Sequence, residues 1–175
     1  YLVGGYFKTD SIDLGNGVVL NSKGNYDGMI IKYNANGETE WAKGIGGIGG
    51  DYIYSAAETL DGGYIVGGNF WSNSIDLGNE INLIKKGTAD GMIIKYSSYG
   101  EVEWAHGIGK TDEASINSVA ATNDGGYIVR GWFKSKNIDL ENGVILTNKG
   151  YTDGMIIKYS SSGEVEWAHG IGGTS

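Results

Sequence analysis

One phrase occurs three times in this chain, and each copy lies 63 residues after the one before. A run with the pattern Y-[LI]-V-x-G opens at Tyr1, Tyr64 and Tyr127. The phrase D-G-M-I-I-K-Y opens at Asp27, Asp90 and Asp153, and a G-E-x-E-W-A phrase places its tryptophan at Trp41, Trp104 and Trp167. A fixed period of this kind is the signature of a repeat protein. The fold must therefore be built from one supersecondary unit used three times.

Each period contains four short segments that favour β structure. We expect the first strand at Tyr52–Glu58 and Ser115–Thr122, and the second at Tyr1–Phe7, Tyr64–Phe70 and Tyr127–Phe133. The Asp-Gly-Gly turn between them supplies positive φ and predicts a hairpin. In the first copy the third and fourth strands are expected at Met29–Tyr33 and Glu38–Lys43, across a turn in which only the glycine is common to all copies. That glycine indicates a left-handed turn position.

The long connection after the second strand carries an apolar phrase of its own. In the first copy, Ile12-Asp13-Leu14 and Val18-Val19-Leu20 flank the pair Asn16-Gly17. Asn-Gly between short apolar runs is the strongest local signal of a hairpin. We therefore expect a small accessory hairpin in this connection.

The composition narrows both the fold class and the partners. The 175 residues include 32 glycines and no proline or cysteine, and 40% are hydrophobic, which argues against disorder. A net charge of -8 disfavours nucleic acid and anionic membranes as partners. No apolar run is long enough to span a bilayer, so membrane insertion is not expected. The chain begins with Tyr1, which suggests a processed product or a segment of a longer protein.

The third strand reads as a nearly continuous apolar run, as in a sheet that is covered on both faces. Four-stranded units with glycine-rich links suit radial stacking, in which each unit is covered by its two neighbours. The predicted fold is therefore all-β, with four-stranded antiparallel β-propeller blades. A three-faced β-prism is the alternative.

The combined phrase D-G-M-I-I-K-Y-x-x-x-G-E-x-E-W-A-x-G-I-G, with the D-G-G-Y-I-V hairpin, resembles the bacterial and archaeal SBBP β-propeller repeats, over all three copies. The resemblance implies that Trp41, Trp104 and Trp167 dock one blade on the next. It also implies a secreted or cell-surface protein, and a fold more than an activity.

The phase of the repeat sets the expected boundaries. Residues 1–50 would form a partial blade without its first strand, and 51–113 and 114–175 would form two blades. A closed propeller has about four to eight blades. Closure then requires further repeats or association of copies through the open blade edges, and a closed dimer would hold about six blades.

Candidate binding residues are those that differ between copies at equivalent positions. Tyr6 and Trp132 flank the invariant phenylalanine of the second strand, and Trp71 follows it. An exposed tryptophan there could stack on a sugar or an aromatic partner, and partial burial against the next blade is the other interpretation. The aspartates Asp27, Asp90 and Asp153 could ring a channel and bind cations or sugar hydroxyls, or could cap their own loops.

Other patterns are weaker. Asn34, Asn36 and Glu38 form a faint oxygen-ligand metal motif or an ordinary turn, so no metal is predicted. Gly44–Gly49 matches G-x-G-x-x-G without a helix to follow it, which indicates a linker and no cofactor. His106 and Glu103 lie at an odd separation on one strand, so their side chains should point to opposite faces.

We predict no enzymatic activity. The expected function is an interaction or display module at the cell exterior, and a multivalent carbohydrate-binding protein is the alternative.

Overall fold

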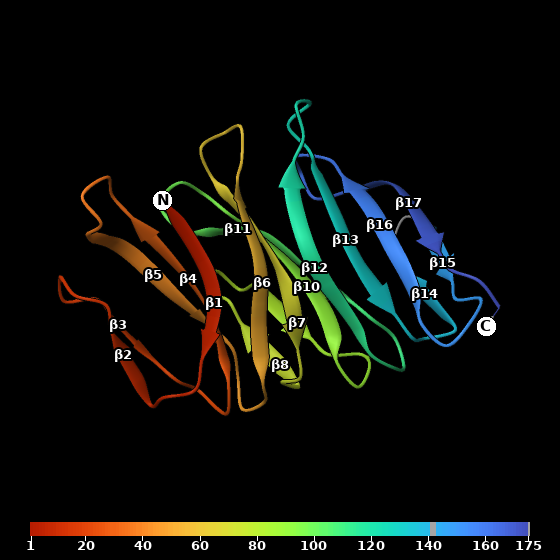
Figure 1. Ribbon diagram of the computed structural model, residues 1–175, viewed down its shortest axis with the longest axis horizontal. Coiled ribbons are helices and arrows are strands. Elements are labelled where there is room, and N and C mark those ends of the chain that lie inside the picture. Colours follow the sequence, from red (N-terminus) through yellow and green to blue (C-terminus); the bar gives the residue numbers. More distant parts are fainter. Residues whose placement is uncertain (141–142, 175) are drawn as a thin grey trace.

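The computed structural model describes residues 1–140 and 143–174, and its regular structure there is entirely β (Figure 1). Sheet 1 pairs β1 (Leu2–Phe7), β4 (Asp27–Tyr33) and β5 (Thr39–Ile45) in that order. Sheet 2 pairs β6 (Asp51–Glu58), β7 (Tyr64–Phe70), β10 (Asp90–Tyr96) and β11 (Val102–Ile108). Sheet 3 pairs β12 (Ala114–Ala121), β13 (Tyr127–Phe133), β16 (Asp153–Tyr159) and β17 (Val165–Ile171). All pairs are antiparallel, so the predicted all-β class and four-stranded unit are confirmed.

The accessory hairpin is confirmed in every copy. It pairs β2 (Ser11–Asp13) with β3 (Val19–Asn21), β8 (Ser74–Asp76) with β9 (Asn82–Ile84), and β14 (Asn137–Asp139) with β15 (Ile145–Thr147). In the first hairpin Asn16 has φ 52° and Gly17 has φ 76°. Two successive positive φ angles are what a type I′ turn requires, and Asn-Gly adopts them at little cost.

The predicted turns also form, and the strand bounds differ by one or two residues. Gly62 and Gly37 have positive φ (78° and 79°), as expected for their turns. The fourth strand begins at Thr39, not at the predicted Glu38, because the Glu38 N–H donates to the Asn34 side chain and belongs to the turn. The third strand begins earlier than predicted, at Asp27, because Asp27 pairs with Phe7.

Glycines on sheets 1 and 2 leave room for an isoleucine from the first strand of the next sheet. A Cβ added to Gly4 would lie 2.9 Å from Cγ2 of Ile53, which is on β6. At the second junction a Cβ on Gly67 would lie 2.6 Å from Cγ2 of Ile116, which is on β12. Ile53 and Ile116 are almost fully buried (2% and 0% exposed), which stabilises each junction by about 2 kcal/mol per side chain.

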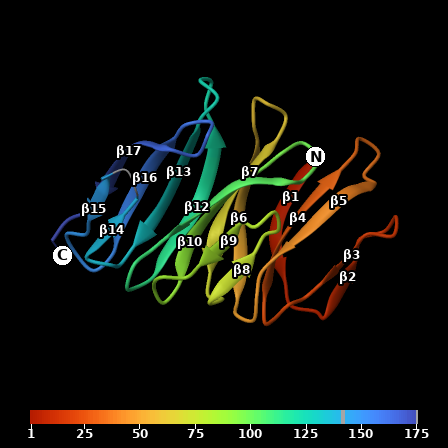
Figure 2. The ribbon, with the colours of Figure 1, turned by 180° about the vertical axis from the view of Figure 1, so that it is seen from behind.

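The three sheets stand side by side, with sheet 2 in the middle and sheets 1 and 3 on opposite sides of it (Figures 1 and 2). One apolar core fills the junction of sheets 1 and 2, and a second core fills the junction of sheets 2 and 3. Within the described residues the sheets form an open row and do not close into a ring. Each outer sheet therefore has one face without a neighbouring sheet.

Candidate functional site

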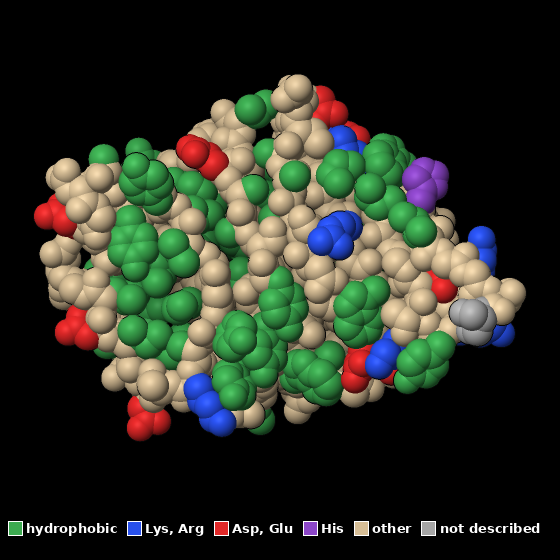
Figure 3. Space-filling model, in the orientation of Figure 1, with side chains coloured by type: hydrophobic (Ala, Val, Ile, Leu, Met, Phe, Trp, Pro, Cys, Tyr) green, Lys and Arg blue, Asp and Glu red, His purple; other side chains and the backbone are tan. Residues whose placement is uncertain are grey.

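Four tyrosines, two exposed and two half-buried, form a group where sheets 1 and 2 meet, which we call the tyrosine cluster (Tyr6, Tyr26, Tyr52 and Tyr54). The Tyr6 and Tyr52 ring centroids are 4.9 Å apart at 75°, and the Tyr52 and Tyr54 rings are stacked at 6.1 Å. Tyr6 and Tyr54 are 50% and 45% exposed. Hydrophobic side chains gather on this face over the end of β1 and the start of β6 (Figure 3). The cluster offers flat aromatic faces to solvent.

Polar groups border the tyrosine cluster. The Tyr54 hydroxyl donates to Oδ1 of Asn69 at 3.1 Å, and Lys8 Nζ lies 4.9 Å from the Tyr26 ring centroid. Burial raises the pKa of Tyr52 and of Tyr54, so both hydroxyls stay protonated at neutral pH. Aromatic faces beside hydrogen-bonding groups can hold a sugar ring or an aromatic side chain.

The two tryptophans predicted to bind a ligand lie outside the tyrosine cluster. Trp71 is 41% exposed, and its carbonyl accepts a hydrogen bond from Lys85. Trp132 is partly buried on β13, and Lys134 Nζ lies 5.6 Å from its ring and 5.5 Å from the ring of Tyr151. The structure thus brings Tyr6 together with other aromatic rings and places Trp132 in a separate lysine-centred group.

The three repeated aspartates are buried, not exposed in a channel. Asp27, Asp90 and Asp153 are at most 1% exposed, and each accepts a backbone N–H from its own loop, donated by Lys23, Lys86 and Lys149 at 2.5, 2.7 and 2.9 Å. A Cβ on Gly46, Gly109 or Gly172 would lie 2.1 Å from the same carboxylates. The glycines of the G-I-G phrase thus give the aspartates room. One oxygen of each aspartate caps its own loop, whereas Oδ1 of Asp27 and Oδ1 of Asp153 have no hydrogen-bond partner among the described residues.

A buried lysine in each complete sheet was not anticipated from the sequence. The Lys95 side chain is 1% exposed, and its Nζ lies 2.9 Å from both Asp61 and Glu103. Burial alone would lower the pKa of Lys95, but the two carboxylates outweigh it and raise that pKa. Burial likewise opposes ionisation of Asp61, and bonds from Thr59, Gly63 and Lys95 overcome it and lower its pKa to about 2. Lys158 repeats the arrangement with Asp124 and Glu166.

The repeated tryptophans of the fourth strands lie against the next sheet wherever a next sheet exists. The Trp41 ring lies 5.7 Å from Tyr64, and a Cβ on Gly100 would lie 3.0 Å from it. Trp104 makes the matching contacts with Tyr127 at 5.7 Å and with Gly163 at 2.7 Å. Trp167 has no following sheet within the chain and is 40% exposed.

The two outer faces of the row expose residues that are buried at the junctions. Ile45 and Ile108 are 1% and 4% exposed, whereas the equivalent Ile171 on sheet 3 is 63% exposed. Tyr64 and Tyr127 are 4% and 1% exposed, whereas the equivalent Tyr1 on sheet 1 is 78% exposed. Hydrophobic side chains also cover sheet 1 at the left of Figure 3. The row thus ends in two apolar faces that match the two sides of its own junctions.

Arg130 breaks this equivalence at one position. Gly4 and Gly67 receive the isoleucine of the next sheet, and the third copy has Arg130 in their place. Arg130 is exposed on β13. A first strand with an isoleucine could not pack there as it does at the two junctions, because the side chain of Arg130 occupies the space.

The weaker motifs have structural explanations. The Asn34 side chain accepts the N–H groups of Asn36 and Glu38 and donates to the Glu38 carboxylate at 2.8 Å, which closes the turn. His106 donates to the Gly163 carbonyl at 2.8 Å, whereas Glu103 pairs with Lys95. In the described part of the chain no group of three or more His, Asp or Glu side chains could hold a metal ion.

Comparison with known proteins adds no relative. No family model matches the chain, and no curated protein matches it either. Among residues 1–140 and 143–174, no helix is long and apolar enough to cross a membrane.

The residues missed from the sequence had a detectable signal. Tyr52 and Tyr54 correspond to Ser115 and Asn117 in the next copy, and Tyr26 corresponds to Ala89. The same comparison of variable positions that identified Tyr6 would have found them. Nothing in the sequence marks Lys95 as buried, because its burial depends on strands that are far apart in the chain.

Proposed function

We propose that the chain is a non-enzymatic assembly module of the cell exterior, whose sheets are β-propeller blades completed by a second copy packed head to tail. The observation that carries the proposal is the exposure of Ile171 and Tyr1, whose equivalents are buried at both junctions. Exposed apolar faces of this kind mark interaction surfaces. The external location is supported by the likeness to SBBP repeats alone.

The contacts at the internal junctions indicate how the second copy would dock. Trp167 of one copy would lie against Tyr1 and Gly37 of the other, as Trp104 lies against Tyr127 and Gly163. Around Gly37 no atom lies within 4 Å of an added Cβ, so the place for this ring is open. Two such interfaces would close a ring of six sheets, within the range of about four to eight blades.

Arg130 favours sheet 1 of a second copy over an ordinary four-stranded blade. A four-stranded blade would bring a first strand, and its isoleucine would meet the Arg130 side chain. Sheet 1 begins with β1 and brings no such strand. The side-by-side row in Figure 1 favours the propeller interpretation of the sheets and not the β-prism interpretation, because sheets 1 and 3 lie apart.

The test is the variant Ile171→Glu, measured by sedimentation velocity. A carboxylate in the centre of an apolar interface lacks a partner, so we expect the dimer to dissociate. The control is Ile84→Glu on β9, because Ile84 is 59% exposed and Ile171 is 63% exposed. A dimer that persists in Ile171→Glu, or dissociates equally in Ile84→Glu, would contradict the proposed interface.

A carbohydrate-binding function is the second candidate, and the tyrosine cluster favours it. Its exposed rings lie beside the Asn69 side chain, the combination that binds sugar rings. A glycan array with the wild type and with Tyr6→Ala tests it. Binding that Tyr6→Ala abolishes supports this function, and no binding at high protein concentration excludes it.

A further inference from the structure

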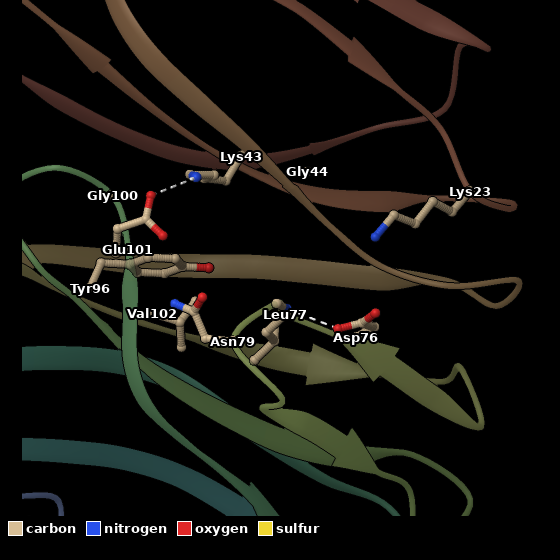
Figure 4. Close-up of a pocket in the computed structure, with 11 residues that line it drawn as sticks. Lys23, Lys43, Gly44, Asp76, Leu77, Asn79, Tyr96, Gly100, Glu101 and Val102 are labelled. Carbon is tan, nitrogen blue, oxygen red and sulfur yellow. Dashed lines mark hydrogen bonds and ion pairs between the residues drawn. The ribbon is translucent and has the colours of Figure 1, made fainter.

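A pocket of about 360 Å³ lies at the junction of sheets 1 and 2, away from the tyrosine cluster. Sheet 1 contributes Lys43 and Gly44 from β5 and Lys23 from the loop before β4. Sheet 2 contributes the turn of its accessory hairpin and the β10–β11 turn. Figure 4 shows these side chains converging from both sheets. The volume is in the range of small-molecule sites.

The hydroxyl of Tyr96 points into this pocket. Tyr96 is 1% exposed, and its ring end faces the pocket in Figure 4. A tyrosine hydroxyl both donates and accepts hydrogen bonds, so it can pair with a ligand atom that enters the pocket.

The charges in the pocket favour an anionic ligand group. Lys23 makes no ion pair with any described residue, and its ammonium group points into the pocket. Lys43 has only a long pair with Glu101, at 3.7 Å, and the two side chains are 40% and 63% exposed. Such an exposed pair contributes little, so a ligand carboxylate can compete for Lys43.

The opposite wall can bind hydroxyl groups. Asn79 and Asp76 come from the accessory hairpin, and the Asn79 side chain points into the pocket from the side of sheet 2 (Figure 4). Oδ1 of the Asp76 carboxylate accepts a hydrogen bond from the Gly78 N–H, and this carboxylate makes no other hydrogen bond with a described residue. Amide and carboxylate groups together both donate to and accept from sugar hydroxyls.

The described residues at the second junction leave a much smaller space. His106 takes the place of Lys43, and its ring stacks on Tyr159 with centroids 5.8 Å apart at 13°. The space lined by His106, Asp139, Leu140 and Tyr159 is only about 10 Å³. Two of the lining positions differ between these copies, because Lys43 and Gly78 correspond to His106 and Glu141.

We propose that the pocket at the first junction binds a sugar carboxylate, namely a uronic acid or one such residue of an acidic glycan. The carboxylate lies between Lys23 and Lys43 and accepts a hydrogen bond from the Tyr96 hydroxyl. The ring hydroxyls face Asn79 and Asp76. The site lies within one chain and is independent of association and of the tyrosine cluster.

The experiment is an NMR titration of the protein with glucuronate, with glucose and acetate as matched probes. Saturable shifts are expected at the amides of Gly44, Gly78 and Gly100 with glucuronate. Glucose lacks the carboxylate and acetate lacks the hydroxyls. The affinity for each should therefore be at least about tenfold lower than the affinity for glucuronate. Equal binding of glucose overturns the role of the lysines, and equal binding of acetate overturns the assignment of a sugar.

Two variants sharpen the test. Lys43→His removes one of the two ammonium groups of the site and should weaken glucuronate binding about tenfold or more. Glu101→Gln should strengthen binding, because Lys43 loses its competitor. Lys149→His is the control, since Lys149 is the third-copy equivalent of Lys23 and is not among the residues that line this pocket. Unchanged affinity in Lys43→His, or weaker binding in Glu101→Gln, overturns the proposal.

Discussion

The internal junctions and the outer faces of this protein are built from the same residues in opposite environments. An isoleucine closes the fourth strand in all three copies, and it is buried at Ile45 and Ile108 and exposed at Ile171. A tyrosine opens the second strand in all three copies, and only Tyr1 is exposed. In a stacked repeat, the neighbouring sheet decides whether a residue belongs to a core or to a surface. The difference teaches that the outer faces of the row are unsatisfied copies of its own junctions.

The strongest test of this comparison is to replace the equivalent tryptophans of a junction and of an outer face, which are Trp104 and Trp167. Trp104→Ala should cost about 3 kcal/mol of unfolding free energy, because the ring packs on Tyr127 and Gly163. Trp167→Ala should cost less than about 1 kcal/mol in dilute solution, where the ring is exposed. Urea unfolding of both variants measures the difference.

Protein concentration adds a second readout to the tryptophan pair. If Trp167 docks on another copy, the cost of Trp167→Ala must grow as protein concentration rises, because association stabilises the folded state by mass action. The cost of Trp104→Ala must not change. Equal and concentration-independent costs would contradict the equivalence of junction and outer face.

A smaller effect is expected from alanine at the position that receives the isoleucine. Gly67→Ala places a Cβ 2.6 Å from Ile116 and 2.7 Å from Val119, so it should destabilise by about 2 kcal/mol through overpacking. Arg130→Ala places an alanine at the equivalent position on the outer face, and it should change the free energy of unfolding by no more than about 0.5 kcal/mol. Thermal unfolding of the two variants decides the matter, and a neutral Gly67→Ala would show that the junction is looser than its geometry indicates.

The smallest effect concerns pH and compares a complete sheet with sheet 1. The pKa of Asp61 is lowered to about 2, so its ion pair with Lys95 stabilises the fold above the ordinary aspartate range near pH 4. This stabilisation is lost as pH falls toward 2. Its size is about 1 kcal/mol, because Asp61 is 56% exposed and solvent screens the pair.

Acid titration of Asp61→Asn measures this contribution. The variant should lose stability at neutral pH and approach the wild type near pH 2. Lys32 on sheet 1 pairs with Glu40 alone, at 3.2 Å. Glu40→Gln is therefore expected to cost less than Asp61→Asn at neutral pH, and the reverse order would show that burial of the lysine does not strengthen its pairs.

The sequence was sufficient for the strands and turns because their causes are local. The positive φ at Gly62 and the Asn16-Gly17 hairpin depend on residues near each other in the chain, and the 63-residue period shows that the same local patterns recur in each copy. The sequence left two interpretations of the repeated aspartates open, and the loop N–H groups that these aspartates accept favour loop capping. Closure into a propeller stays a proposal, because it depends on a neighbour outside the chain.

The candidate sites depend on the packing of one sheet against another, which no local pattern reveals. Tyr6 was found from the sequence as a variable position, but its partner Tyr52 comes from the next sheet. The pocket at the first junction combines Lys43 of one sheet with Tyr96 of the other. The sequence shows that Lys43 and Gly78 become His106 and Glu141 in the next copy, but the sizes of the two spaces are known only from the structure.

The native mass of the protein in solution tests the central claim most directly. Light scattering over a range of concentrations should give twice the mass of one chain, because two head-to-tail interfaces close a six-sheet ring. A mass that stays that of a single chain at every concentration would contradict the proposal that the outer faces pair with each other.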